Sequence, residues 1–152
     1  MGLFNELSKG KLLGHPIHVM LVHFPLALFP VSLVLDIIYL QSGGLLFSTM
    51  SFYCLCIGLA GGFAAAVFGL WDLLNIGKDP DVLRTAFIHG GINSLILFSY
   101  TIIATLRYKQ PDYASASPDI QVITNALLNV LLVTAAYFGG ELVFRYKVGI
   151  KK

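Results

Sequence analysis

The sequence has little charge. Asp, Glu, Lys and Arg together make up 12% of its 152 residues, about half the share found in a soluble globular domain. Hydrophobic residues make up 57%, and the net charge is only +2. No basic run is interleaved with aromatic residues, so we expect no nucleic-acid partner. This composition predicts an integral membrane protein whose main partners are lipids.

Cysteine is also scarce, and the familiar catalytic motifs are missing. The two cysteines, Cys54 and Cys56, lie too close in sequence for an ordinary disulfide and sit in an apolar run, where they act as packing residues. No serine has the Gly-x-Ser-x-Gly setting of a hydrolase, and no Gly-rich phosphate loop opens a helix. Classical hydrolase and nucleotide chemistry are therefore disfavoured.

What the sequence does have is four long apolar runs, at about residues 17–40, 47–76, 82–106 and 120–146. Each is long enough to cross a hydrocarbon core of about 30 Å. Nothing alternates with period two over these lengths, so strands are not expected. We predict an all-α fold, in which residues 1–152 form a single integral membrane four-helix bundle, antiparallel and up-down.

The positive residues predict the orientation of the bundle. Most of them lie with the two termini and the loop between the second and third runs, at a side that we call end A. They are Lys9, Lys11, Lys78, Arg84, Arg145, Lys147, Lys151 and Lys152. The opposite side, end B, has only Arg107 and Lys109. Because cytoplasmic loops are enriched in Lys and Arg, both termini are predicted to be cytoplasmic.

All four histidines and two acidic residues, in or next to the runs, lie near end A. They are His15, His18, His23, His89, Asp72 and Glu141. Such residues are costly in a bilayer and usually face a bundle interior or water. Each of them alone has a simple explanation, such as an ion pair between Glu141 and Arg145. Together, at one depth, they predict a bound group or a proton path.

The first hypothesis is a b-type haem near the cytoplasmic face, used for electron transfer. Haem in a four-helix bundle is held by axial histidines from facing helices. His23 and His89 lie at matching depth on different helices, so they are the predicted pair. His18 points about 140° away from His23 at 100° per residue and is the substitute ligand.

Other residues near end A suit the same haem hypothesis. Gly90 and Gly91 would let a porphyrin approach the backbone beside His89. Arg84 or Arg145 would pair with the propionates. Asp72 or Glu141 would orient a ligand imidazole through its second nitrogen.

Two alternatives stay open. In one, His15, His18, His23, His89, Asp72 and Glu141 supply three or four ligands to a zinc, iron or copper ion, or pass protons. In the other, the protein is an accessory structural subunit of a respiratory or photosynthetic membrane complex, or a homo-oligomer. Its glycine-rich second run permits close helix contacts. The end-B half has only Asp36 and scattered hydroxyls and amides, which disfavours transport of a bulky solute.

The start of the first run resembles a known signature. The segment from Gly14 to Pro25 follows the pattern G-H-P-x-H-x-x-x-x-x-F-P, which opens a bacterial family of membrane proteins of unknown function. Three later features also resemble that family: Asp72, the string His89-Gly90-Gly91 and the closing string Gly139-Gly140-Glu141-Leu142-Val143. The resemblance covers about residues 14–149.

This resemblance implies little about function. Some relatives carry a Rieske-type iron–sulfur domain, which by association implies electron transfer with a redox protein partner in the bacterial inner membrane. The present sequence has no Cys/His pattern for such a domain.

Overall fold

The computed structural model describes residues 10–149 and has four long helical segments. The helices are α2 (Ile17–Leu21), α3 (His23–Ser42), α4 (Leu45–Asn75), α5 (Pro80–Tyr108) and α6 (Pro118–Gly140). A short 3-10 helix, η1 (Pro111–Tyr113), precedes α6, and a π-helical segment, η2 (Glu141–Arg145), continues it. The spans that are long and apolar enough to cross a membrane are Ile17–Ser42, Leu45–Asn75, Pro80–Tyr108 and Pro118–Arg145. The predicted all-α, four-span fold is confirmed, and no span end differs from its prediction by more than two residues. The expectations for Lys9, Lys151 and Lys152 lie outside the described residues.

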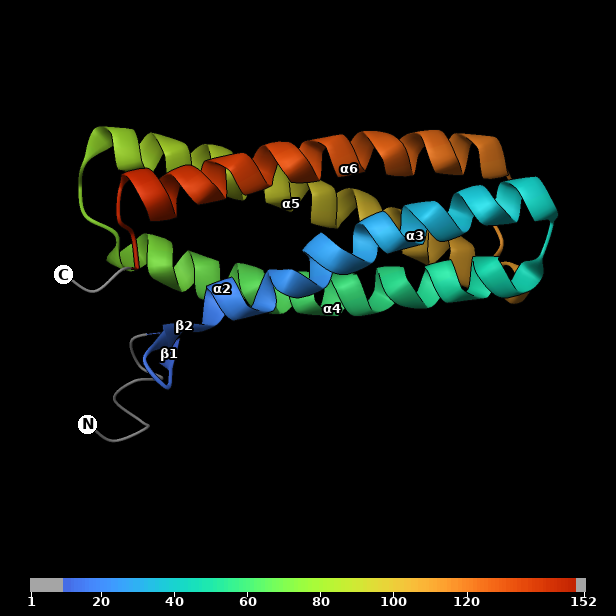
Figure 1. Cartoon of the computed structure of the whole chain (residues 1–152), viewed down its shortest axis with the longest axis horizontal. Helices are drawn as coiled ribbons and strands as arrows, with labels where there is room; N and C mark the ends of the chain where they lie inside the picture. Colours follow the sequence, from blue (N-terminus) through green and yellow to red (C-terminus); the bar gives the residue numbers. More distant parts are fainter. Residues whose placement is uncertain (1–9, 150–152) are drawn as a thin grey trace.

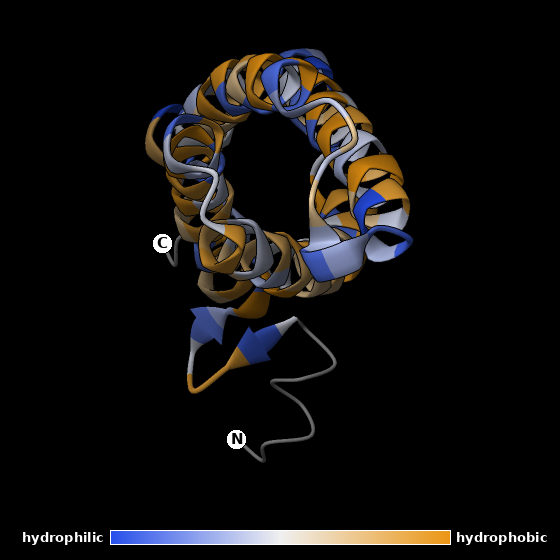
Figure 2. Ribbon diagram, turned by 90° about the vertical axis from the view of Figure 1, so that its right-hand side faces the viewer, coloured by the Kyte–Doolittle hydropathy of each residue, from blue (hydrophilic) through white to orange (hydrophobic). Residues whose placement is uncertain are grey.

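The helices form a ring, seen along the bundle in Figure 2. Helix α4 packs against α3 and α5, and α6 packs against the same two helices, so α3 and α5 occupy opposite corners. The two-residue connection at Gly43 and Gly44 turns the chain back at end B (Figure 1). Gly43 adopts φ = 68°, the left-handed conformation in which helices often end and which glycine takes without strain.

Large apolar side chains cover the outside of this ring. Val67, Phe98 and Val133, from three different helices, are 68%, 66% and 71% exposed. Hydrophobic residues extend along the helices in Figure 2. An apolar surface of this extent would be a liability in water but is the ordinary lipid-facing surface of a membrane bundle.

A proline breaks the first span close to end A. Pro25 has no N–H to offer the carbonyl oxygen of Leu21, and α2 ends at Leu21. Helix α3 begins two residues later at His23 and continues through Pro30. The first span is therefore interrupted at Val22, and a helix boundary separates His18 from His23.

A small hairpin precedes α2 at end A. Strand β1 (Lys11–Leu12) pairs antiparallel with β2 (His15–Pro16). The turn residues Leu13 and Gly14 have φ of 51° and 80°, and two positive φ values characterise the tight turns that match strand twist. The sequence did not predict these strands, because a ladder of two residues is too short to show a period.

Glycines bring α4 close to α3. A Cβ atom on Gly58 would lie 2.6 Å from Phe29 Cε1, and one on Gly61 would overlap Phe24. Only glycine lets the two aromatic rings lie directly on the α4 backbone. The row of small residues therefore serves helix packing inside the bundle.

Candidate functional site

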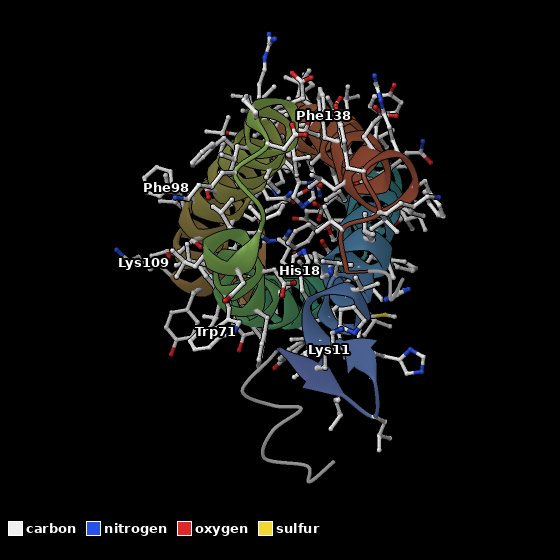
Figure 3. The ribbon with its side chains drawn as sticks, turned by 90° about the vertical axis from the view of Figure 1, so that its left-hand side faces the viewer. Lys11, His18, Trp71, Phe98, Lys109 and Phe138 are labelled. Carbon is white, nitrogen blue, oxygen red and sulfur yellow. The ribbon has the colours of Figure 1, made fainter. Side chains whose placement is uncertain are left out.

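Two histidines meet inside the ring near end A. The ring centroids of His18, from α2, and His89, from α5, are 6.2 Å apart, and the ring planes are nearly perpendicular at 88°. Figure 3 shows His18 on the inner side of the helices, whereas Trp71 and Phe98 point outward. The pair comes from opposite corners of the bundle.

Each imidazole makes the same hydrogen bond. His18 Nδ1 lies 2.8 Å from the Ala65 carbonyl oxygen on α4, and His89 Nδ1 lies 2.8 Å from the Ala135 carbonyl oxygen on α6. Because a carbonyl oxygen can only accept, Nδ1 carries the hydrogen in both rings. A neutral ring of this tautomer keeps its lone pair on Nε2. A backbone carbonyl on the opposite nitrogen is also the usual orienting partner of a metal-bound histidine.

A glycine lies beside each ring. A Cβ atom on Gly69 would be 2.9 Å from His18 Cε1, and one on Gly139 would be 2.9 Å from His89 Cε1. Each glycine follows the hydrogen-bonding alanine by four residues, one helical turn along the same face. Thus α4 and α6 each offer one imidazole a carbonyl oxygen and a flat backbone surface.

The predicted pair of His23 and His89 is not brought together. His23 is exposed, and its Nδ1 lies 3.2 Å from the carbonyl oxygen of Met20 in its own chain segment. His18, the substitute, occupies the interior position opposite His89. His15 is exposed in β2, outside the helical ring.

The acidic residues do not orient the imidazoles, because backbone carbonyls do. Asp72 lies within electrostatic reach of His18 and Lys11. Glu141 forms the expected ion pair with Arg145, 2.9 Å between Oε2 and Nη1. Over residues 10–149, no three His, Cys, Asp or Glu side chains gather closely enough to hold a metal ion. The expected set of three or four protein ligands is therefore not assembled.

The remaining predicted haem contacts lie away from the histidine pair. A Cβ atom on Gly90 or Gly91 would meet nothing within 4 Å, and both residues are exposed. Arg84 is exposed as well, and Arg145 is paired with Glu141. The glycines that contact imidazole rings are Gly69 and Gly139.

Asn93 lies one helical turn after His89 on α5 and contacts it. Its Nδ2 donates to the His89 carbonyl oxygen at 2.8 Å and lies 3.4 Å from each nitrogen of the His89 ring. These ring distances are long for a hydrogen bond. The Nε2 atom of His89 is thus left with at most one weak interaction from Asn93.

A second polar cluster lies at end B. Asp36 Oδ1 and Arg107 Nη1 are 2.9 Å apart, and both side chains are at most 3% exposed. Arg107 also donates to the carbonyl oxygens of Tyr113 at 2.8 Å and Ser48 at 2.7 Å. The third predicted run ends at residue 106, which leaves Arg107 in the connection at end B. In the structure α5 continues to Tyr108, and its last turn carries Arg107 into the bundle, where it neutralises Asp36.

This cluster reaches the middle of the bundle. Asn125 Nδ2 donates to Asp36 Oδ2 at 2.9 Å, and the Tyr100 hydroxyl donates to Asn125 Oδ1 at 2.6 Å. The buried apolar residues Ile96 and Leu132 lie between this cluster and the histidine pair along α5 and α6. The two polar sites are therefore separated by an apolar layer.

One repeated string in the sequence marks the residues that surround the two histidines, although the hydrophobic periodicity does not show it. The string Ala-Ala-x-Phe-Gly occurs twice, at residues 65–69 and again at residues 135–139. In both copies the first alanine supplies the carbonyl oxygen and the glycine supplies the flat surface.

Comparison with known proteins gives a family and no closer relative. No curated protein and no solved structure matches the chain. One family does match, over residues 14–152, a range that includes His18, His89, Asp36 and Arg107. The resemblance noted from the sequence is confirmed at this level: the chain belongs to the family described as "predicted membrane protein (DUF2231)".

Proposed function

We propose that this membrane protein binds a haem b between His18 and His89, near the cytoplasmic face of the bacterial inner membrane, and serves in electron transfer. The observation that carries the proposal is the facing pair of imidazoles, each with Nδ1 held by a backbone carbonyl oxygen. With Nδ1 bonded in this way, each ring keeps its Nε2 lone pair for a metal.

The separation of the rings supports a shared centre. Two imidazoles on opposite sides of one metal ion, each with a metal–nitrogen bond of about 2 Å, have centroids about 6 Å apart. The observed separation is 6.2 Å. A smaller ligand–metal–ligand angle, as in a tetrahedral site, would require the rings to lie closer together.

The donor set favours haem over a bare ion. A zinc or copper ion in a protein takes three or four protein ligands, and residues 10–149 gather no such group. A haem brings four nitrogens of its own and needs only axial ligands from the protein. Two neutral imidazoles are therefore a sufficient donor set for haem and an insufficient one for a structural metal ion.

Each part of the site has a role in this proposal. The carbonyl oxygens of Ala65 and Ala135 fix the tautomer and the plane of the two rings. Gly69 and Gly139 let the rings lie against α4 and α6. The apolar layer at Ile96 keeps water that enters from end B away from the metal centre. When bound, the haem supplies a one-electron Fe(III)/Fe(II) couple.

End A is the side from which we expect a redox partner to approach. The histidine pair lies near that end, and Lys78, Arg84 and Lys147 there are exposed. Exposed Asp79 and Asp81 lie close to Lys78 in the sequence, so this rim offers a partner charges of both signs. The partner would be a redox protein or a larger membrane complex, because no second redox-active group is apparent in the sequence.

An optical difference spectrum with metal analysis tests the proposal. The protein is purified in mild detergent and measured oxidised and reduced, before and after addition of haem. We expect a Soret band with sharp reduced α and β bands, and about one iron for each chain. Stoichiometric zinc or copper without these bands would contradict haem in favour of a bare ion. No metal and no haem uptake would contradict the redox proposal and favour the accessory-subunit alternative.

A further inference from the structure

Three contacts across the bundle join residues that are equally far apart in the chain. Asp36 and Arg107, which form the buried ion pair, are separated by 71 residues. The same separation holds for His18 and His89 and for Phe29 and Tyr100, whose ring centroids are 4.1 Å apart. These pairs lie at three successive depths, and each joins the first span to α5.

The buried faces of the helices repeat with nearly the same interval. Four of the five buried residues of α3 have buried counterparts 71 residues later: Pro25, Phe29, Ser32 and Asp36 correspond to Ile96, Tyr100, Ile103 and Arg107. The exception is Leu35, whose counterpart Leu106 is exposed. All four buried residues of α6 lie 70 residues after buried residues of α4: Leu55, Gly58, Gly62 and Ala65 correspond to Asn125, Leu128, Leu132 and Ala135.

The sequence repeats where the site is built. Ile17-His18 recurs as Ile88-His89, and Ala-Ala-x-Phe-Gly of residues 65–69 recurs at 135–139. In each half the histidine bonds to the alanine of its own half, over 47 residues in the first and 46 in the second. Each half therefore contains one complete imidazole holder.

We propose that the chain is a duplicated helical hairpin, α2–α3–α4 followed by α5–α6, with a two-fold axis along the bundle, and that one metal centre lies on this axis with an equivalent imidazole from each half. The placement of α3 and α5 at opposite corners, each packed against α4 and α6, is what such an axis requires. The shared metal centre rests on the proposed haem function, whereas the duplication of the hairpin does not.

The chemistry of the three axial pairs supports this relation. On a two-fold axis, identical residues must meet each other, and two aspartates or two arginines would repel. At the 36/107 position the halves differ, and the meeting is an ion pair. At the 18/89 position they are identical. Two identical neutral imidazoles on the axis can both bind one metal centre. This position therefore had no reason to diverge between the halves.

The halves also differ at positions that do not meet their counterparts on the two-fold axis. Gly58 and Gly61, which admit Phe29 and Phe24, correspond to Leu128 and Leu131 in the second half. Pro25, which breaks the first span, corresponds to Ile96, and α5 is continuous. The first hairpin is consequently packed more closely than the second, while the imidazole holders are the same.

The two-fold relation is tested without any cofactor. Gly69→Ala and Gly139→Ala each push a methyl group into an imidazole, and Gly90→Ala, which meets open space, is the matched control. We expect both site variants to lower the thermal unfolding temperature in detergent by similar amounts, within a factor of two, and the control to match wild type. A loss confined to one of the two site variants would overturn the equivalence of the halves.

The equivalence of the ligands is tested on the haem-loaded full chain. His18→Met and His89→Met each replace one axial imidazole by a thioether, which raises the reduction potential of a haem. We expect the same spectral change and the same upward shift of midpoint potential in both. If one variant kept the wild-type spectrum, the ligands would not be equivalent and this clause would be wrong. A wild-type protein without chromophore would overturn the haem proposal and the shared metal centre, while the glycine comparison would still test the equivalence of the two halves.

Discussion

Asp36 and Arg107 form an ion pair of 2.9 Å inside the bundle, with side chains that are 3% and 2% exposed. The pair connects α3 with α5, two helices at opposite corners of the ring. Arg107 also donates to Ser51 Oγ at 3.1 Å and to two carbonyl oxygens, so the guanidinium has several partners besides the carboxylate. End B is thus closed by a buried polar cluster.

Breaking this pair is expected to destabilise the protein strongly. Asp36→Leu leaves the Arg107 guanidinium buried without a counter-charge, and Arg107→Met does the same to the carboxylate. Each single change should lower the free energy of unfolding by about 3–5 kcal/mol, measured by denaturant titration in detergent. The double variant should cost clearly less than the sum, because no unpaired charge remains.

The exposed ion pair at end A is the control for this experiment. Arg145 and Glu141 lie 2.9 Å apart with side chains that are 67% and 26% exposed. Because water competes for the charges of such an exposed pair, Arg145→Ala should change the stability far less than either end-B variant.

Additive losses in the Asp36/Arg107 double variant would show that the two residues do not act as a pair.

Gly58→Ala is expected to separate α3 from α4. The new methyl group would overlap Phe29, whose ring is fully buried against the α4 backbone. The overlap should cost about 1–3 kcal/mol of folding free energy, as for other overpacked cores. Gly91→Ala, which meets nothing within 4 Å, is the matched control, and equal unfolding temperatures for the two variants would contradict the close packing.

Tyr100→Phe tests the polar cluster in mid-bundle. It removes the hydroxyl that donates to Asn125 Oδ1 at 2.6 Å and accepts from Asn129 Nδ2 at 3.1 Å. The ring packing on Phe29 is kept. Loss of a partner for buried amide groups should cost about 1–3 kcal/mol of stability, seen as a lower unfolding temperature. An unchanged temperature would mean that these amides find other partners.

The four spans could be predicted from the sequence because apolar length is a local property. Breakers such as Gly43 and Pro80 lie next to the ends of the runs, and the four spans begin and end within two residues of the predicted limits. The concentration of histidines near end A could be predicted in the same way, because depth follows from position along a straight helix.

The direction in which each side chain points around its helix was harder to predict. The sequence gives His18 and His23 opposite directions but does not say which one faces inward. That choice depends on the break at Pro25 and on Gly69, a residue that is distant in sequence and accommodates the His18 ring. Arg107 shows the same limit, since its counter-charge at Asp36 lies on a helix two spans earlier.

The most direct test of the haem site compares four histidine variants by their reduced-minus-oxidised spectra after identical haem loading. His18→Ala and His89→Ala remove the facing imidazoles, whereas His15→Ala and His23→Ala remove exposed ones. We expect the first two variants to lose the sharp reduced α band of a bis-imidazole haem and the last two to keep it. Loss of this band in His23→Ala together with its retention in His18→Ala would contradict the site described here.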